Sequence, residues 1–389
     1  MKSEASNTFI QHLTKKYNVF PVIALFVTLA CACQSRLPGT NSATLIPSEK
    51  IRMRVDYLTA NSAGMMSILN DSILTFENRL TNCIQFYNLN QQTFISELCF
   101  DIRGPNGTGP LIGYLVETLD SIYIMGDHTR SVVLANQRSE VVSAFKLSRH
   151  DFGTPVGGTF FPIRRIDNIL YFAAPINHNI YTVSSVGGIL EIAYDLNTQT
   201  HTEHFHLPEE YDGFHNTYYI TFSRDIDAAG NFVYSFPMCH DLYIKSPQGK
   251  VRKVAASSPY ALGTTIRKNT IINDNTDEIK ADIEGYKYRF IVYDPYRSVY
   301  YRFVTHPMSY LDPATGLPRR RDEKPFSIII LDKNFNKIGE RVFPAKQYLI
   351  DNYFLNSRGL WISNNHPANP EMEEDYLSFT LLKLAYDEE

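Results

Sequence analysis

The stretch Tyr218–Val254, YYITFSRDIDAAGNFVYSFPMCHDLYIKSPQGKVRKV, contains the unit that the rest of the chain repeats. Short runs of aromatic and β-branched residues are separated by turn-forming Asp, Asn, Gly and Pro, a pattern typical of antiparallel strands joined by tight turns. The runs are Tyr218–Phe222, Phe232–Phe236 and Leu242–Ile244, and a fourth begins at Val251. The stretch therefore predicts a four-stranded meander, the form of one β-propeller blade.

The same pattern recurs along the chain. A polar turn followed by a short apolar strand occurs six times, at residues 70–76, 120–124, 167–172, 230–234, 297–303 and 357–362. Strand–turn–strand elements follow at 83–98, 131–145, 179–194, 241–254 and, after an insertion, 327–343. One meander cannot bury both faces of its sheet, so the copies are expected to pack around a closed ring. We predict an all-β fold, a six-bladed β-propeller of four-stranded antiparallel blades; seven blades or a large double sandwich are the alternatives.

The first residues have the form of a bacterial lipoprotein signal. Lysines precede a mostly apolar run at residues 18–32, which is shorter than a membrane span. The run ends in small residues before Cys33, and polar residues follow at once, so Cys33 is the predicted acylation site. Cys31 fits a looser form of the motif. An ordinary cleaved signal and an anchor helix are the alternatives.

The chain is accordingly divided into a lipoprotein signal peptide at 1–33, a flexible tether at 34–48 and a β-propeller domain at 49–389. An early strand at Ile51–Leu58 is expected to pair with a last strand at Leu377–Leu384 and close the ring. The longer connections, where binding residues concentrate, are expected on one rim. They are 101–110, 148–159, 257–286 and 305–324.

Charge and cysteine usage narrow the class of protein. The net charge is −4 and the basic residues are scattered, which argues against a nucleic-acid partner. Cys83 and Cys99 lie in two expected strands of one hairpin, so in an exported protein they are candidates for a disulfide. The alternative is two buried cysteines that do not meet, and Cys239 has no evident partner.

Several sequence segments carry a family resemblance. NFVYSFP at 231–237 followed by LYI at 242–244, and YRFIVYDPYRSVYYRF at 288–303, are similar to phrases of Bacteroidetes-type β-propeller lipoproteins, a domain-of-unknown-function family. The resemblance covers most of the chain after the signal. It implies the propeller fold and attachment to the envelope of a Gram-negative bacterium, with the outer membrane expected and the face left open. It supplies no active residues.

Basic and aromatic residues at expected strand ends are the ligand-binding candidates. They are His215, Tyr218, Tyr219, Arg224, Arg289 and Arg302. If they converge on the central channel, they would suit an anionic or sugar-like ligand, because Arg pairs bidentately with anions and aromatic rings stack. The alternative interpretation is that they cover the surfaces between blades.

No catalytic, metal or cofactor signature is present. His204 and His206 would share one face of a strand, but zinc-type spacing is lacking, which favours a solvated strand. Asp332–Asn336 resembles part of a calcium loop, but the glycine comes late, which favours a hairpin turn. We therefore predict no catalytic residues, no metal and no cofactor.

The leading functional hypothesis is an envelope-anchored lipoprotein that serves as a binding platform for a glycan, peptide or protein partner. A glycan hydrolase or lyase working in the central funnel is the second hypothesis, and it requires carboxylates or a His/Tyr/Arg group converging there. A structural subunit of an envelope complex is the third. A plugged channel would favour the binding platform.

Overall fold

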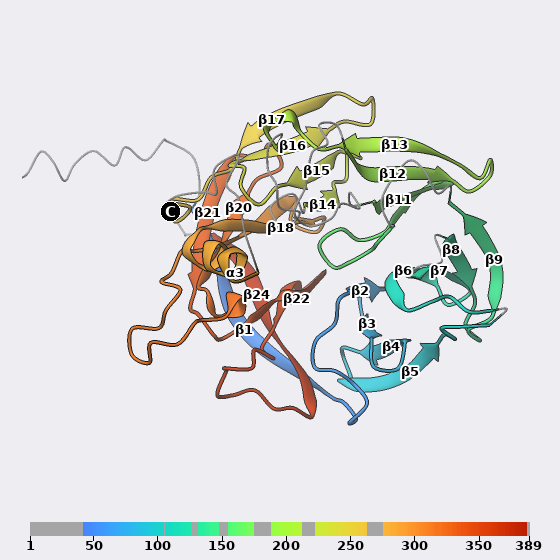
Figure 1. The fold of residues 1–389 in the computed structure, drawn as a ribbon, viewed down its shortest axis with the longest axis horizontal. Coiled ribbons are helices and arrows are strands. Elements are labelled where there is room, and N and C mark those ends of the chain that lie inside the picture. Colours follow the sequence, from blue (N-terminus) through green and yellow to red (C-terminus); the bar gives the residue numbers. More distant parts are fainter. Residues whose placement is uncertain are drawn as a thin grey trace, which may run out of the picture. The chain divides into compact units, whose positions relative to one another are not determined.

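The computed structural model describes residues 42–104, 106–126, 131–147, 155–174, 188–211, 222–262 and 275–386. Within these residues, six antiparallel sheets of four strands follow one another as the blades of a propeller (Figure 1). The prediction of six four-stranded blades is therefore confirmed. The first strands of neighbouring blades contact one another, as β14 does β18 and β22 does β2, so they line the axis.

The strand bounds, blade by blade, are as follows. The first blade holds β2 (Met66–Leu69), β3 (Ile73–Asn78), β4 (Cys83–Asn88) and β5 (Thr93–Cys99), and the second β6 (Leu111–Thr118), β7 (Ser121–Gly126), β8 (Ser131–Ala135) and β9 (Val141–Lys146). The third holds β10 (Arg164–Ile166), β11 (Ile169–Ala173), β12 (Ile189–Asp195) and β13 (Thr200–His206), and the fourth β14 (Ser223–Ile226), β15 (Phe232–Ser235), β16 (Asp241–Lys245) and β17 (Val251–Ala255). The fifth holds β18 (Lys287–Asp294), β19 (Val299–Thr305), β20 (Phe326–Leu331) and β21 (Lys337–Phe343), and the sixth β22 (Leu349–Asn356), β23 (Gly359–Ser363), β24 (Tyr376–Tyr386) and β1 (Ala43–Arg54).

The sixth blade is completed by the start of the described chain. β1 pairs antiparallel with β24, in a register that sets Met53 opposite Leu377. The predicted pairing of an early strand with the last one is thus correct, but the strand begins at Ala43, inside the segment predicted as tether. Pro47 lies at a register shift of this outer strand, a position where a sheet tolerates proline, and its presence made the segment resemble a linker.

The core lies between the blades rather than in one central mass. Middle strands such as β3 and β4 are almost fully buried, whereas the outer strands β5 and β17 are mostly exposed. One apolar cluster joins Phe303 and Ile328 of the fifth blade to Tyr353 and Leu360 of the sixth. Stacked sheets therefore bury both faces of each blade, as the repeat pattern requires.

Two strand predictions were shifted. The first strand of the fourth blade is Ser223–Ile226 rather than Tyr218–Phe222, of which only Phe222 is described. Asp225 resembles a turn residue in sequence, but its side chain is held within the sheet by partners from other blades. In the third blade the outer hairpin is 189–206 rather than 179–194, because β12 pairs with the polar β13.

The alternation of strand direction sorts the connections onto two rims. Links from first to second and from third to fourth strands lie on one rim, which we term the turn rim, and they are tight turns such as Asp332–Asn336. All other links lie on the opposite rim, which we term the loop rim. The described parts of the connections 101–110, 257–286 and 305–324 belong to the loop rim, as expected. Of the connection 148–159, residues 148–154 lie outside the described residues and residues 155–159 run through the axis.

Three helical elements interrupt the connections in the described residues: η1 (Glu209–Tyr211), α3 (Asn275–Glu284) and η2 (Arg321–Glu323). The helix α3 lies in the long connection 257–286. None of the helices in the described part of the chain has the length and apolar character needed to cross a membrane.

Candidate functional site

The chain that enters the third blade runs through the centre of the propeller. We term Pro155–Ile163 the axial segment. Gly157 N donates to Ile112 O of the second blade, and Val156 N donates to Ala173 O of the third blade, both at 2.9 Å. In Figure 1 this chain, drawn in green ahead of β11, lies among the inner strands β2, β6 and β14.

Thr159 ties the axial segment to the first and sixth blades. Its Oγ1 accepts a hydrogen bond from Met66 N at 3.1 Å, where β2 begins. Its carbonyl accepts one from the Tyr353 hydroxyl of β22 at 3.4 Å. Thr159 is itself buried, so these bonds satisfy polar groups that water does not reach.

Phe160 ties the segment to the fourth and fifth blades. Its carbonyl accepts hydrogen bonds from Arg224 N at 2.9 Å and from Ser223 Oγ at 2.8 Å, both in β14. Its ring lies 5.5 Å from that of Phe290 in β18. The axial segment therefore contacts all six blades and fills the axis.

Two glycines, Gly113 and Gly157, permit this passage of the chain through the axis. A Cβ on Gly113 of β6 would lie 2.6 Å from the Cα of Gly157, so neither position has room for a side chain. Only glycine lets the two backbones approach this closely.

Two cavities among the described residues lie toward opposite rims. Along β22, Leu349–Asp351 line a cavity at the loop rim, Tyr353 then contacts the axial segment, and Leu355 lines a cavity at the turn rim. The same order holds along β18. We term the two cavities the basic mouth, at the loop rim, and the turn mouth.

The turn mouth has a volume of about 430 Å³ and is lined by the inner strands of five blades. Its carboxylates are engaged by the fold. Asp225 pairs with Arg164 at 3.1 Å and accepts Tyr293 N at 2.9 Å. Asp227 accepts Asn231 Nδ2 at 2.9 Å and the hydroxyl of a tyrosine from the fifth blade.

Asp71, at the edge of the turn mouth, is held in the same way. Burial acts to raise the pKa of its carboxyl, but hydrogen bonds from Ser357 and Tyr296 outweigh it, so the pKa lies below its ordinary value. Ser357 N lies 2.7 Å and the Tyr296 hydroxyl 2.9 Å from Asp71 Oδ1. A general acid needs the opposite shift, so Asp71 does not fit that role.

The basic mouth has a volume of about 670 Å³ and lies between α3, the 305–324 connection and the starts of β18 and β22. Five cationic side chains line it against three carboxylates. They are Arg289, Arg319, Arg320, Arg321 and Lys324, and Asp282, Asp322 and Asp351. Arg289 pairs with Asp351 at 2.5 Å, and Arg321 pairs with Glu278 of α3 at 2.9 Å.

Two lysines are buried at or beside this cavity. The Lys324 ammonium donates to the carbonyls of Asp282 and Gly285, the latter at 2.7 Å. Burial lowers the pKa of Lys324 to about 8, with Asp282 opposing and Arg289 adding to the shift. Burial, and then Arg289, also lower the pKa of Lys287 well below its ordinary value. The crowding of like charges disfavours each cation and would be relieved by an anion.

Of the predicted ligand-binding residues, Arg224 is fully buried between blades and is also one of the residues at the wall of the turn mouth. Its Nε donates to Glu191 Oε1 at 2.7 Å, and its Nη1 donates to Pro162 O at 2.9 Å. Glu191 also accepts the Tyr234 hydroxyl at 2.5 Å. These contacts fit the alternative interpretation, that the arginine joins neighbouring blades.

Arg302 is fully buried as well. Its guanidinium donates to the carbonyls of Cys239, His240 and Ala256 at 2.6 to 2.8 Å and to Ser235 Oγ at 3.0 Å. Burial lowers the pKa of Arg302 to about 10. The donors are directed at the fourth blade, so this residue lies away from both mouths.

Arg289 is the predicted ligand-binding residue that lines a cavity at the loop rim. The structure therefore does not bring the predicted set together. His215, Tyr218, Tyr219, Cys31 and Cys33 lie outside the described residues.

The sequence analysis missed Arg319 and Tyr310 as candidates. The triplet Arg319–Arg321 lies among Pro, Gly and Asp, a composition typical of a solvated loop. The available signal was the insertion itself, since a long connection inside a blade is unusual and such loops often bind ligands.

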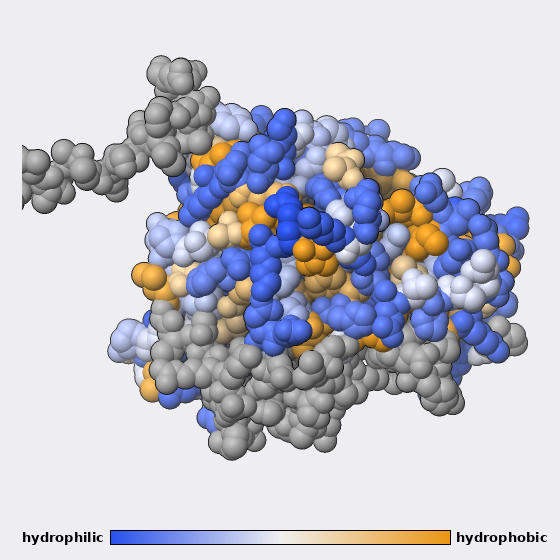
Figure 2. Space-filling model, turned by 90° about the horizontal axis from the view of Figure 1, so that it is seen from above, coloured by the Kyte–Doolittle hydropathy of each residue, from blue (hydrophilic) through white to orange (hydrophobic). Residues whose placement is uncertain are grey.

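The predicted histidine strand is β13, and it borders a groove of about 810 Å³ with β16 and β17. His206 pairs with Glu203 at 2.8 Å. Burial lowers the pKa of His204 to about 3, helped by Lys245. Seen from the side where β13 and β17 lie in Figure 1, hydrophilic residues surround apolar ones (Figure 2). This is the half-solvated outer strand that the sequence favours.

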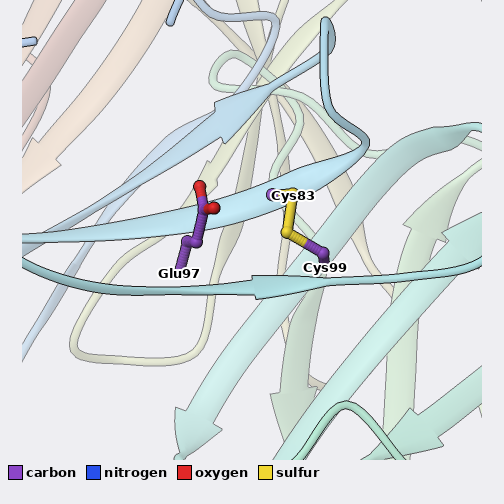
Figure 3. Close-up of side chains that lie close together, drawn as sticks. All are labelled: Cys83, Glu97 and Cys99. Carbon is purple, nitrogen blue, oxygen red and sulfur yellow. A yellow bond between two sulfur atoms is a disulfide. The ribbon is translucent and has the colours of Figure 1, made fainter. Parts of the chain in front are cut away.

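Cys83 and Cys99 are directly opposed in β4 and β5 and are joined by a disulfide (Figure 3). Glu97 lies beside them, and the three form a group within the distance of metal ligands. A disulfide leaves no thiolate, the form in which cysteine binds metals. Glu97 instead accepts Gln85 Nε2 at 3.2 Å.

Solved structures of other proteins share this architecture. A crystal structure of a DUF4221 family member from Bacteroides vulgatus has a TM-score of 0.76 and 24% identity, covering 90% of this chain and all of the other. A Bacteroides fragilis protein whose assigned name describes it as exported has a TM-score of 0.53 and 11% identity, covering 91% of this chain and 98% of the other. Both likenesses establish the fold alone.

No curated protein matches the chain. The family model described as Domain of unknown function (DUF4221) matches residues 42–342, from the closing strand into the fifth blade. The match covers well over half of the chain and confirms the resemblance seen in its sequence. The chain belongs to the DUF4221 family of β-propellers.

Proposed function

We propose that this propeller is a binding platform for a glycan, peptide or protein partner, which it takes at the loop rim. The axial segment carries the proposal. It contacts all six blades at the axis, and an occupied axis favours binding at a rim over catalysis in a central funnel. The long connections and the basic mouth lie on the loop rim, where a rigid scaffold presents variable loops to a ligand.

The alternative of an enzyme in the funnel has less support. The turn mouth holds carboxylates, but Asp225 and Asp227 hold neighbouring strands and turns together through their hydrogen bonds. Asp71 has a lowered pKa, which suits an ionised anchor rather than a proton donor. A pair of carboxylates poised for glycoside chemistry needs one member with a raised pKa.

The proposal includes attachment to the bacterial envelope by lipid on Cys33, with the outer membrane as the expected site. The signal-like start supports it, and so does the fold of an exported Bacteroides protein. Two or three acyl chains would hold the mature protein firmly to a bilayer.

Thermal unfolding of residues 34–389 with neutral and acidic glycans, peptides and divalent metals tests the proposal. A ligand at about a hundred times its Kd adds ~2.7 kcal/mol to the free energy of unfolding. We expect a shift that Arg319→Ala reduces and that Arg138→Ala, an exposed arginine at a turn of the opposite rim, leaves unchanged. A shift of equal size in both variants would contradict binding at the loop rim, and product analysis of the bound ligand detects any turnover.

A further inference from the structure

The basic mouth contains a small hairpin that is not needed for the blade. The connection from β19 to β20 folds back on itself, with Arg319 N donating to Tyr310 O at 2.8 Å and Asp312 N donating to Leu317 O at 2.9 Å. Leu311 and Pro318 form a bridge between the two arms. The hairpin therefore sets Tyr310 and Arg319 side by side, and both line the cavity.

The Arg319 guanidinium is held loosely. Its contacts with Asp312 Oδ2 are both 3.4 Å, and its contact with Ser309 O is 3.3 Å. Charge-assisted hydrogen bonds of an arginine are ordinarily 2.7 to 2.9 Å, as in the Arg321–Glu278 pair at 2.9 Å. A ligand carboxylate could therefore pair with the Arg319 guanidinium while displacing only these weak contacts.

The surroundings favour an anion at this position. Five cationic side chains line the mouth against three carboxylates, while Glu278 and Asp312 pair with two of its arginines from outside the lining. The buried Lys324 ammonium donates its hydrogen bonds to carbonyl oxygens. The cavity, at about 670 Å³, is far larger than a single inorganic anion and lies in the range of small-molecule sites. An extended ligand that repeats its charge fits both the volume and the spread of arginines.

We propose that the basic mouth binds an anionic glycan, with a sugar ring packed on Tyr310 and an acidic group paired bidentately with Arg319. This assignment rests on the proposed binding function and gives it a ligand class. A pyranose ring offers an apolar C–H face to the tyrosine and an equatorial acid group at its edge. Arg289 and Arg320 lie where neighbouring charged sugars of the same chain would follow. Uronate carboxylates and sugar sulfates share this chemistry.

Calorimetric titration of the mature protein with matched oligosaccharides tests the assignment. The probes are short galacturonic-acid oligomers, the same oligomers as methyl esters, and a sulfated oligosaccharide of similar length. The ester keeps the shape and removes the charge, so we expect at least about tenfold weaker binding for it. Binding of the acidic forms should also weaken as salt rises. Binding of the sulfated form alone assigns the acid as sulfate.

Variants connect the binding to the hairpin. Arg319→Ala should lower the affinity for the acidic oligomer about tenfold to a hundredfold, since a hydrogen bond to a charged group is lost. Tyr310→Ala should also weaken it, whereas Tyr310→Phe should not. Arg138→Ala is the control for a lost surface arginine, and thermal unfolding checks that each variant folds.

Three results would overturn the assignment. They are equal affinity for acid and ester, equal affinity for inorganic phosphate or an acidic peptide, and binding that Arg319→Ala leaves intact. If the protein bound a neutral glycan or a peptide but no acidic oligomer, the ligand class would be refuted while the proposed binding function would stand. Absence of any ligand or partner would refute both.

Discussion

Gly113 of β6 and Gly157 of the axial segment bring two backbones into direct contact in the centre of the propeller. A Cβ on Gly113 would lie 2.6 Å from the Cα of Gly157. We expect Gly113→Ala to push the axial segment aside and to lower the free energy of unfolding by about 1–3 kcal/mol, as overpacking does. Urea unfolding followed by tyrosine and tryptophan fluorescence measures the change.

Gly158→Ala is the matched control in the same segment. Its Cβ would meet Phe161 at 3.4 Å, an ordinary van der Waals distance, so its effect should stay within about 0.5 kcal/mol. Equal stability of Gly113→Ala and the unmodified protein would show that the axial segment is not held against β6.

Arg302 joins the fifth blade to the fourth through three carbonyls and a hydroxyl. Arg302→Ala leaves these buried acceptors unsatisfied, and we expect it to lower the free energy of unfolding by at least about 3 kcal/mol. Arg341→Ala, on an exposed position of β21, should cost less than about 0.5 kcal/mol. Ligand binding by folded Arg302→Ala should be unchanged, and a selective loss of binding would restore this residue as a site candidate.

The Cys83–Cys99 disulfide closes a loop with a sequence separation of 16 residues. Chain entropy predicts that reduction lowers the free energy of unfolding by about 3 kcal/mol. Chemical unfolding with and without a reducing agent measures the difference. The double variant Cys83→Ala/Cys99→Ala is the control, because a reductant should leave its stability unchanged. A protein that is insensitive to reductant would contradict the bridge.

His306 predicts a pH dependence of stability. It is buried with Nε2 at 3.0 Å from Ser327 Oγ, and burial lowers its pKa to about 4, with Glu340 opposing. The unfolded chain takes up this proton near pH 6.5, so the stability contributed by neutral His306 is full above pH 6.5 and is lost as the pH falls toward 4.

Urea unfolding at several pH values between 7 and 4 checks this sign. Carboxylates elsewhere also titrate in this range, so the informative quantity is the difference between the unmodified protein and His306→Gln. We expect the variant to lose about 1–2 kcal/mol less over the window. Parallel profiles for the two proteins would mean that His306 is protonated equally in both states.

Lipid attachment is tested by metabolic labelling with a fatty acid in a Gram-negative host. Cys33→Ser should lose the label and move from the membrane to the soluble fraction, because acyl chains supply the anchoring energy. Cys31→Ser should keep the fatty-acid label and stay in the membrane fraction. The reverse result would move the acylation site to Cys31, and label on neither cysteine would contradict a lipid anchor.

Most of the fold could be predicted from local signals. Each six-fold copy of turn and strand marks the second strand of a blade, from Ile73–Asn78 to Gly359–Ser363. The errors fell where tertiary partners override local chemistry. Asp225 resembles a turn residue but lies in a strand because Arg164 and Tyr293 N engage its carboxylate. Pro47 resembles a linker residue but lies in an outer strand that tolerates it.

The candidate site was less predictable. Arg224, Arg289 and Arg302 are equivalent in a linear sequence, since each follows or precedes apolar strand residues. Burial between blades makes the first and third into interblade contacts, while the second reaches the basic mouth. The Tyr310–Arg319 pair arises only when the hairpin closes.

The sequence by itself therefore favoured six blades, determined the antiparallel order of strands within them, and made Cys83 and Cys99 candidates for a disulfide. These depend on period-two patterning, turn residues and separations along the chain, which are local quantities. Only the tertiary structure decided that Pro155–Ile163 closes the axis and that the cations of the loop rim meet in one mouth. Those features depend on distances between residues far apart in the chain, and no local pattern encodes such distances.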